Sequence, residues 1–320
     1  MKYAAQRLVH AVFLLLGVSV LSFLFADLAP GDFFSELRLD PRVSADTVAG
    51  LRAQYGLDRP LPVRYATWLG SVAQGNFGYS LAYRGPVGPL LRQRMRGTLL
   101  LTATATCVAW LLAVPLGIWN ATQRGTWRDG FFKFVLGLLL SIPDLLLAIV
   151  FLVLAVQSGW FPAGGMQSLD LSSLSPVERL RDVVWHMALP VAVLVIGMLP
   201  ILVRHVRASM VEAMNAPFAL SARAHGIPRL RLLFRHLLPA ALNPLISLFG
   251  FSLGTLLSAS LLIEVIMGWP GLGPLFLDAI MARDFALVLG VVMMSTIFLV
   301  AGNLAADLLL YRMDPRIRVR

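Results

Sequence analysis

Long apolar runs alternate with short polar stretches along most of this chain. A hydrocarbon core about 30 Å thick takes roughly 20 residues of α-helix, and the apolar runs are about that long. The pattern predicts six membrane-spanning helices, at Val9–Leu28, Thr98–Trp119, Phe134–Val156, Val184–Val203, Leu242–Met267 and Phe285–Tyr311. The predicted fold class is therefore an all-α polytopic membrane protein.

A long polar segment, Ala29 to Gly97, separates the first two predicted spans. It contains two amphipathic patterns, over Ser44–Gly56 and Pro62–Gly75, in which apolar residues recur at helical spacing. The apolar faces consist of Val48, Leu51 and Tyr55 in the first pattern and Tyr65, Trp68, Leu69 and Val72 in the second. We interpret both as surface helices that belong to the scaffold rather than to a binding site.

Composition supports a membrane protein and argues against a nucleic-acid partner. The chain of 320 residues is 58% hydrophobic and 14% charged, with a mean hydropathy of +0.77. Its net charge of +10 comes almost entirely from arginine, since Lys2 and Lys133 are the only lysines. Basic residues in short membrane loops generally mark the cytoplasmic side. We therefore expect membrane lipid, and no nucleic acid, around this chain.

The charges of the short loops predict the orientation. The stretch Asn120–Lys133, the loop after the fourth span and the C-terminal tail are basic, whereas Ser158–Asp182 and Glu264–Asp284 carry more acids than bases. Six spans with both termini in the cytoplasm satisfy this alternation. The N-terminus begins like a signal peptide, but its apolar run is long and no A-x-A site follows, so we expect an uncleaved first span.

The stretch from Val211 to Pro239 is the most distinctive polar segment. Asn215 and Pro217 predict a helix start, Gly226 predicts its end, and Pro228 fits the first turn of a second helix. Six arginines surround the first helix against a single acid, Glu212; they are Arg204, Arg207, Arg223, Arg229, Arg231 and Arg235. Phe218, Ala222 and His225 are spaced to share one face. Two interpretations remain open: a cytoplasmic docking element, or a solvated basic loop that only sets the topology.

The chain lacks the motifs of an enzyme. No G-x-x-x-x-G-K-[ST] occurs, so it cannot bind nucleotide through a P-loop of its own. The five histidines lack the spacing of zinc ligands, and no G-x-S-x-G or S-x-x-K is present. The single cysteine, Cys107, lies in an apolar run. We predict no catalytic residue and no metal site.

Two carboxylates within the predicted spans are candidates for a translocation path. Asp144 follows Pro143 in the third span, and a charge there is costly in lipid unless it faces a bundle interior or water. The alternative is that Asp144 only bonds a neighbouring helix; Pro143 can kink the helix in either case. Glu264 leads into Ile266–Gly273, where a tryptophan followed by Pro-Gly suggests a rigid cap at the outer interface. His186 and Pro190 are expected to open span four.

The loop residues resemble the inner-membrane permeases of binding-protein-dependent ABC importers, in particular the dipeptide, oligopeptide and nickel branch. The cytoplasmic motif of that superfamily is E-A-A, three residues, G, nine residues, I-x-L-P. Gly226 takes the glycine position, Ala222 the second alanine, and Leu238 and Pro239 the end of the motif. Leu220, Ser221 and His236 depart from the general motif. The run Ala222–Gly226 is similar to the A-R-A-K-G version of the peptide branch.

The resemblance extends from the first loop to the tail. Further shared stretches are Ala29–Asp32, Tyr55–Tyr65, Pro115–Gly117, His186–Pro190, Trp269–Gly273 and Asp314–Arg318. It implies a fold of the type I ABC importer permease kind. The implied domains are residues 1–97, with the first span and a long periplasmic loop, residues 98–311, a permease core with a coupling loop over 204–241, and residues 312–320, a basic cytoplasmic tail.

The resemblance also implies a location and a set of partners. The chain is expected in the bacterial inner membrane, beside a second, homologous permease, with two cytoplasmic ATPases below and an external solute-binding protein above. ATP and Mg²⁺ would then bind to the ATPases and not to this chain. Coupling to the ATPases would involve Pro217, Phe218, Ser221, Ala222, Arg223, Ala224, His225, Gly226 and Pro228.

The implied function is a permease subunit that forms the path for peptides or a similar small solute. The substrate stays open among peptides, nickel, glutathione and related solutes, because specificity in such systems resides largely in the binding protein. The alternative hypothesis is a proton-coupled secondary transporter that uses Asp144, which would require internal repeats and broken helices. A membrane-embedded enzyme or structural protein is a third reading, with no catalytic constellation to support it.

Overall fold

The computed structural model describes residues 2–29, 31, 33–35, 44–54, 56–168 and 175–313 of the chain. The described residues divide into two compact units. Unit 1 comprises residues 1–98 and 270–298, and unit 2 comprises residues 99–269 and 299–320. Most of the predicted tail at 312–320, and parts of the Ala29–Asp32 and Tyr55–Tyr65 motifs, lie outside the described residues.

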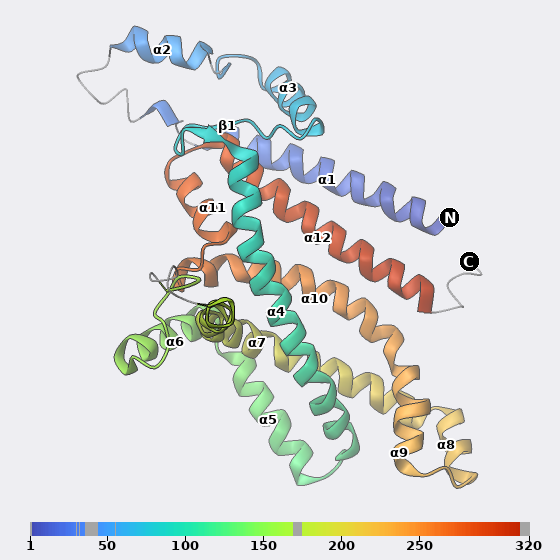
Figure 1. Ribbon diagram of the computed structural model, residues 1–320. Helices are drawn as coiled ribbons and strands as arrows, with labels where there is room; N and C mark the ends of the chain where they lie inside the picture. The colour runs from blue at the N-terminus through green and yellow to red at the C-terminus, as the bar shows by residue number, and fades with distance from the viewer. Residues whose placement is uncertain are drawn as a thin grey trace. The chain divides into compact units, whose positions relative to one another are not determined.

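Unit 1 is helical apart from one short hairpin (Figure 1). Its elements are α1 (Lys2–Leu28), the 3₁₀ helix η1 (Phe33–Ser35), α2 (Ala45–Gln54), α3 (Leu61–Ala73), strands β1 (Tyr79–Ser80) and β2 (Gly85–Pro86), and α11 (Leu272–Met281). The helices α4 (Val87–Thr122) and α12 (Phe285–Met313) each contribute residues to both units.

Aromatic side chains attach α3 to α1 within unit 1. The ring of Phe23 lies 5.5 Å from the ring of Tyr65, edge to face, and 5.8 Å from that of Trp68. The hydroxyl groups of Tyr65 and Ser19 are hydrogen-bonded at 2.8 Å. The predicted apolar face of the second surface helix is thus half-buried against the first span. In α2, Val48 is buried and Leu51 half-buried, as the pattern predicted, whereas Tyr55 lies outside the described residues.

The β1–β2 hairpin is held to the start of α12 by one carboxylate. Asp284 accepts hydrogen bonds from the Ser80 hydroxyl at 2.7 Å and from the Ala82 amide at 3.0 Å. It also caps α12, because its second oxygen accepts from the Leu287 amide at 3.2 Å. The Tyr83 hydroxyl donates to Asp278 at 2.7 Å, and burial together with this bond raises the pKa of Tyr83.

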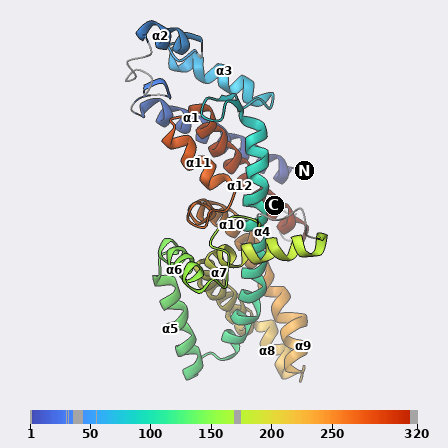
Figure 2. The same ribbon diagram turned by 60° about the vertical axis from the view of Figure 1, so that its left-hand side comes forward.

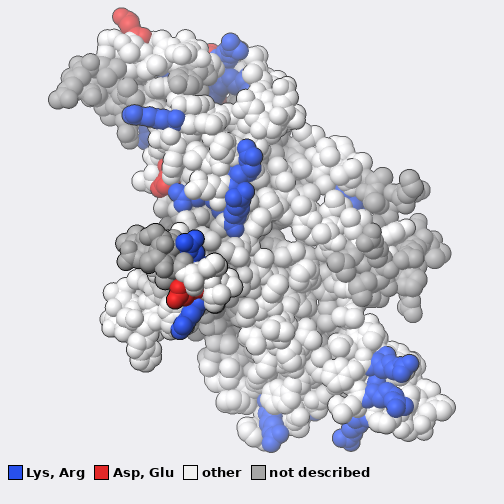
Figure 3. All heavy atoms as spheres, viewed as in Figure 1, with Lys and Arg blue, Asp and Glu red and all other residues white. Residues whose placement is uncertain are grey.

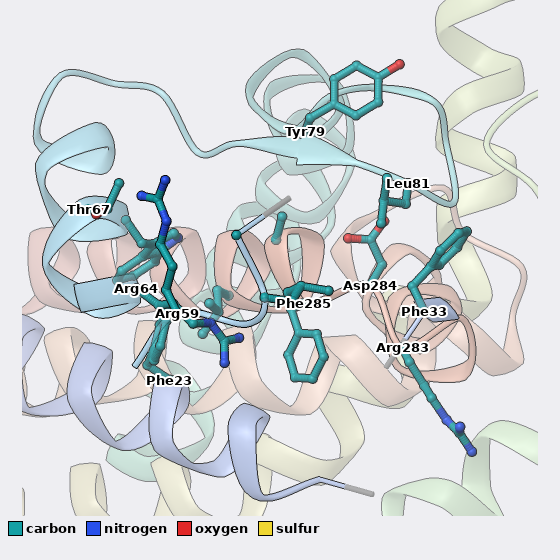
Figure 4. Close-up of a pocket in the computed structure, with 15 residues that line it drawn as sticks. Phe23, Phe33, Arg59, Arg64, Thr67, Tyr79, Leu81, Arg283, Asp284 and Phe285 are labelled. Carbon is teal, nitrogen blue, oxygen red and sulfur yellow. The ribbon is translucent and has the colours of Figure 1, made fainter. Parts of the chain in front are cut away.

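A pocket of about 270 Å³, here called the Phe23 pocket, lies in unit 1 between α1, α3 and the start of α12. Figure 4 shows Phe23, Arg59 and Arg64 on one side of it and Phe33, Leu81 and Asp284 on the other. Arg64 is paired with Asp27 and stands over the Phe23 ring, and Asp284 is occupied by the hairpin. Two of the four charged residues that line this pocket, Arg64 and Asp284, therefore hold α3 and the hairpin in place.

Unit 2 contains the remaining elements, namely α5 (Trp127–Ser141), α6 (Asp144–Ser158), α7 (Pro176–Asn215), α8 (Pro217–Ala224), α9 (Arg229–Leu232), the π-helix η4 (Leu233–Leu237) and α10 (Leu238–Ile266). Helix α7 is its centre, since α5, α6, α8 and α10 all pack against it. The main core joins α4, α6, α7 and α10 through Leu101, Ala148, Leu194 and Ile263. The Trp110 indole donates to the Ser252 hydroxyl at 3.0 Å and links α4 to α10.

Small residues let helices of unit 2 approach closely. A side chain at Gly117 of α4 would come within 2.6 Å of Val206 of α7, so only glycine fits there. This explains physically why the Pro-Leu-Gly run of the second span contains a glycine. At Gly250 of α10, an added Cβ would meet the Ala306 methyl in the same way.

The described helices include five that are long and apolar enough to cross a membrane, and a sixth span if the pair α5 and α6 counts as one. The fold class is as predicted, but a continuous helix over Phe134–Val156 is wrong. The chain bends by 86° between α5 and α6. Ile142 is extended because it precedes Pro143, and α6 begins afresh at Asp144. Asp144 thus starts a helix and does not lie in the middle of one.

Helix α7 begins earlier than predicted. A capping box starts it, in which the Glu178 amide donates to the Ser175 hydroxyl and the Ser175 amide donates to the Glu178 carboxylate. His186 and Pro190 consequently lie inside α7 and do not open it. The imidazole of His186 is bonded at 2.8 Å to the Asp182 carbonyl one turn earlier.

Trp269 is not exposed on the surface of unit 2. Its side chain is fully buried in the main core of unit 2, and its amide donates to the Glu264 carbonyl at 2.8 Å. Gly268 has a φ of +60°, which lets the chain turn directly after α10. The tryptophan therefore acts as a core residue. The apolar helix α11 that follows has 10 residues, too short to span a bilayer.

Candidate functional site

The helix predicted within the basic loop is present as α8, a helix of 8 residues. Pro217 occupies its first turn, as expected of a residue without an amide hydrogen. At its other end, the Gly226 amide donates to the Arg223 carbonyl at 3.0 Å and the Ile227 amide donates to the Ala222 carbonyl at 3.1 Å. This is a Schellman motif, and the φ of +73° at Gly226 is what the motif requires of its glycine.

One side of α8 is buried in a set of small and aliphatic residues, here called the Ala219 cluster. Ala219 itself has no exposed surface. The other fully buried members come from α4, α7, α9, η4 and α10 and are Ala121, Val206, Met210, Ala213, Leu232, Leu237, Ala241 and Leu245. Because α4, α7 and α10 all contribute, α8 is packed against three long helices.

The other sides of α8 and α9 are exposed and combine apolar with basic side chains. Large apolar side chains are exposed by 44% at Phe218, 57% at Leu220, 71% at Leu230 and 59% at Phe234. Arg223, Arg229, Arg231 and Arg235 are exposed around them. Figure 3 shows Lys and Arg side chains gathered over α8 and α9, with no acidic side chain among them in that view. Exposed apolar anchors within a charged rim are typical of a protein docking surface.

The predicted coupling residues do not all share one face. Phe218, Ser221, Arg223, Ala224, His225 and Gly226 are exposed, and Pro217 and Pro228 are exposed at the helix boundaries. Ala222, by contrast, is half-buried and packs on the Ala219 cluster. The predicted face of Phe218, Ala222 and His225 is therefore divided between the surface and the interior. Sequence spacing places these residues on one face, but it does not say which flank of that face packs inward.

The predicted end of the motif, Leu238 and Pro239, lies in a continuous helical segment formed by α9, η4 and α10. Pro228 precedes α9, η4 follows α9 without a break, and Leu238 begins α10. Pro239 has no amide hydrogen to donate to the preceding turn, and its ring would collide with the carbonyl four residues earlier. The wider π-turn of η4 lies directly before Pro239 and relieves that collision.

Sequence reasoning missed an ion-pair network at the same end of unit 2. Asp129, near the start of α5, is 3% exposed and accepts from Arg207 of α7 at 3.0 Å and from Lys133 at 2.8 Å. The Gly125 amide donates to the same oxygen at 3.3 Å. Figures 1 and 2 both show the α4–α5 turn at the end of unit 2 where α8 and α9 lie. The comparison of acidic and basic residues in the loops included these residues, but it could not predict that Asp129 pairs with Arg207, 78 positions away.

The two candidate path residues have opposite environments. Asp144 is exposed, and within the described residues its carboxylate has no hydrogen-bond partner. It lies against Gly197 of α7, where an added Cβ would overlap the carboxylate. Glu264 has no exposed surface and lies one turn before Trp269. The structure does not bring Asp144 and Glu264 together, and their role on a path stays a prediction.

The long apolar helices define a multi-pass membrane protein, and α8 and α9 form an exposed, basic helix pair at one end of unit 2. Two family models match the chain. They describe a binding-protein-dependent transport system inner membrane component, over residues 113–319, and the N-terminal part of such a component, over residues 1–102. The chain belongs to this family of ABC importer permeases, whose members are transport components of the inner membrane.

Curated relatives match over the whole length. The oligopeptide transport system permease protein AppB of Bacillus subtilis is 35% identical over 317 residues, which are 98% of each chain. The glutathione transport system permease protein GsiC of Salmonella typhimurium is 31% identical over 323 residues, which are all of each chain. No finding supports the proton-coupled alternative.

A solved structure shares the fold. The methionine ABC transporter MetNI, in an inward-facing conformation, has a chain with a TM-score of 0.58 at 18% identity, which covers 70% of this chain and 96% of that one. At this identity the likeness concerns the fold alone. It confirms the type I importer permease architecture predicted from the sequence.

Proposed function

We propose that the chain is a permease subunit that couples ATP hydrolysis in partner subunits to the import of a peptide or a glutathione-like solute. The substrate class is suggested by two full-length relatives, which are named for oligopeptide and glutathione transport. Both substrates are peptides with free carboxylates. The chain would form the path together with a second, different permease, and an external binding protein would deliver the solute.

The observation that carries the proposal is the construction of α8. Its exposed side has apolar anchors among arginines, and its buried side is fixed to α4, α7 and α10 through Ala219. One of two cytoplasmic ATPases, which bind ATP and Mg²⁺, would receive α8 and α9 in its cleft. Arg223 would form charge-assisted hydrogen bonds there, and closure of the ATPases would move the three long helices.

This proposal places both termini in the cytoplasm. The basic surface of α8 and α9 then lies on the same side as the α4–α5 turn, as the positive-inside rule requires. Arg124 in that turn is exposed and takes no part in α8, so it provides a matched control for a change of charge.

The test is retention of the ATPases by the solubilised complex, together with ATP-dependent uptake in vesicles. Arg223→Glu should reduce both by about tenfold, which corresponds to roughly 1.4 kcal/mol of docking free energy. Arg124→Glu should leave both unchanged, and both variants should insert normally. Equal retention of the ATPases by Arg223→Glu and by the wild-type chain would show that α8 does not couple through this arginine.

A further inference from the structure

A second site lies in unit 2, away from the exposed sides of α8 and α9. Residues of α4, α5 and α7 line a half-open cavity of about 600 Å³, here called the Asn120 cavity. This volume falls within the range of about 300–1,000 Å³ that is typical of small-molecule sites. The lining residues are Asn120, Lys133, Leu136, Gly137, Leu140, Ile201, Arg204, His205, Arg207 and Ala208.

The polar wall of the Asn120 cavity is basic. Lys133, Arg204 and Arg207 line it, and no acidic residue does. Asp129 contacts Lys133 and Arg207, so it offsets one of the three positive charges. Arg204 has no ion-pair partner within the described part of unit 2. The site is thus electropositive before any ligand enters, and it favours an anion.

Buried polar groups in the cavity lack partners. Asn120 has no exposed surface, and neither its side-chain oxygen nor its side-chain nitrogen makes a hydrogen bond. The Nε of Arg207 is likewise buried without a partner. Unpaired buried donors are rare because a donor that is buried without a hydrogen bond costs free energy. A ligand with several acceptor oxygens would satisfy both donors and the charge of Arg204 together.

The apolar wall consists of Leu136, Leu140 and Ile201, which lie on the same two helices as the basic residues. Helix α5 also exposes Trp127, Phe131, Phe134 and Leu138, which this chain leaves uncovered. Trp127 is typical of the membrane–water interface, and Lys133 lies six residues further along α5, or about 9 Å at ~1.5 Å per residue. The cavity therefore adjoins an exposed apolar surface of α5.

We propose that the Asn120 cavity binds a phosphate-bearing anion, held by Arg204, Arg207, Lys133 and Asn120, and that the form which fits its apolar wall is an anionic phospholipid. Basic pockets between membrane helices on the cytoplasmic side hold such headgroups elsewhere. The bound phosphate would join α4, α5 and α7, and it would do so independently of the docking of the ATPases.

The experiment uses the complete purified transporter in nanodiscs of phosphatidylcholine that contain a fluorescent phosphatidylglycerol as the probe. Binding is followed by energy transfer from the protein tryptophans. Unlabelled phosphatidylglycerol should displace the probe, and phosphatidylcholine should not. Glycerol phosphate, which has the phosphate without acyl chains, distinguishes a lipid ligand from a soluble phosphate. Weak displacement supports a lipid ligand, whereas displacement equal to that by the lipid supports the phosphate site and assigns it to a soluble anion.

Variants locate the site. Arg204→Gln should weaken binding of the probe about fivefold, in line with roughly 1 kcal/mol for each basic residue at an anionic membrane surface. Arg204→Lys should restore most of the binding. Since Arg204 is exposed and has no partner within the described residues, neither change is expected to unfold the chain. Arg124→Gln removes the same charge from an exposed turn outside the cavity and should have no effect.

Three results would overturn the proposal. The first is unchanged binding in Arg204→Gln. The second is an equal loss in Arg204→Gln and Arg124→Gln, which would indicate nonspecific attraction to basic residues. The third is displacement of the probe by phosphatidylcholine as effectively as by phosphatidylglycerol, which would show that the cavity recognises no phosphate charge and is filled by any lipid, by water or by the second permease.

Discussion

The two helices of the bent pair, α5 and α6, each have a carboxylate in the first turn, and the two carboxylates have opposite surroundings. Asp129, in the first turn of α5, is 3% exposed, and one of its oxygens accepts from Arg207, Lys133 and the Gly125 amide. Asp144, in the first turn of α6, is exposed and has no partner among the described residues. A buried carboxylate with such partners generally serves structure, whereas a free one in a membrane segment is a candidate for function.

This difference predicts opposite results when each carboxylate is removed. The largest effect is expected for Asp129→Ala, which leaves Arg207 and Lys133 without their acceptor at the junction of α5 and α7. Breaking a buried pair in this way costs about 3 kcal/mol. The measurement is the free energy of unfolding of the purified chain in detergent.

Asp144→Ala is the matched control for Asp129→Ala, because it removes the same carboxylate from a site without partners. Its free energy of unfolding should change by less than about 0.5 kcal/mol, as at ordinary exposed sites. A cost below about 1 kcal/mol for Asp129→Ala would contradict the structural role of the network, since that is the range of exposed ion pairs.

An intermediate effect is expected where Asp144 touches α7. In Gly197→Ala, the added methyl group would overlap the Asp144 carboxylate, so either that side chain rotates away or α6 shifts from α7. Such overpacking costs about 2 kcal/mol. If the collision is the cause, the double variant Gly197→Ala with Asp144→Ala should recover most of the loss, and a double-mutant cycle would give the coupling between the two positions.

Gly137→Ala serves as the control for this cycle. Gly137 lies within α5, and nothing lies within 4 Å of a Cβ placed there. Alanine favours the helix over glycine by about 1 kcal/mol, so this variant should be neutral or more stable. A similar loss in Gly137→Ala and Gly197→Ala would mean that the contact with Asp144 is not what requires glycine at position 197.

The comparison of the two carboxylates also shows what the sequence could predict. The long apolar runs, the basic loop and the end of α8 at Gly226 are local signals, so the fold class and the predicted helix boundaries of that loop follow from them. The start of α7 had a local signal too, Ser175 with Glu178, which the hydrophobic pattern alone did not use. The pairing of Asp129 with Arg207 and the burial of Trp269 depend on contacts between distant segments, and no spacing rule contains them.

The smallest effect on stability is expected for Asp144→Asn, which retains the shape of the side chain and removes its charge. Because no group within the described residues pairs with this carboxylate, the free energy of unfolding should change by less than about 0.5 kcal/mol. If Asp144 lines the path as the sequence predicts, ATP-dependent uptake should fall severalfold while the ATPases remain bound. Uptake in reconstituted vesicles, with and without ATP, measures this. Unchanged uptake would show that Asp144 does not line the path and is only a contact of Gly197. Uptake that requires Asp144 and a proton gradient but no ATPase would instead support a proton-coupled carrier.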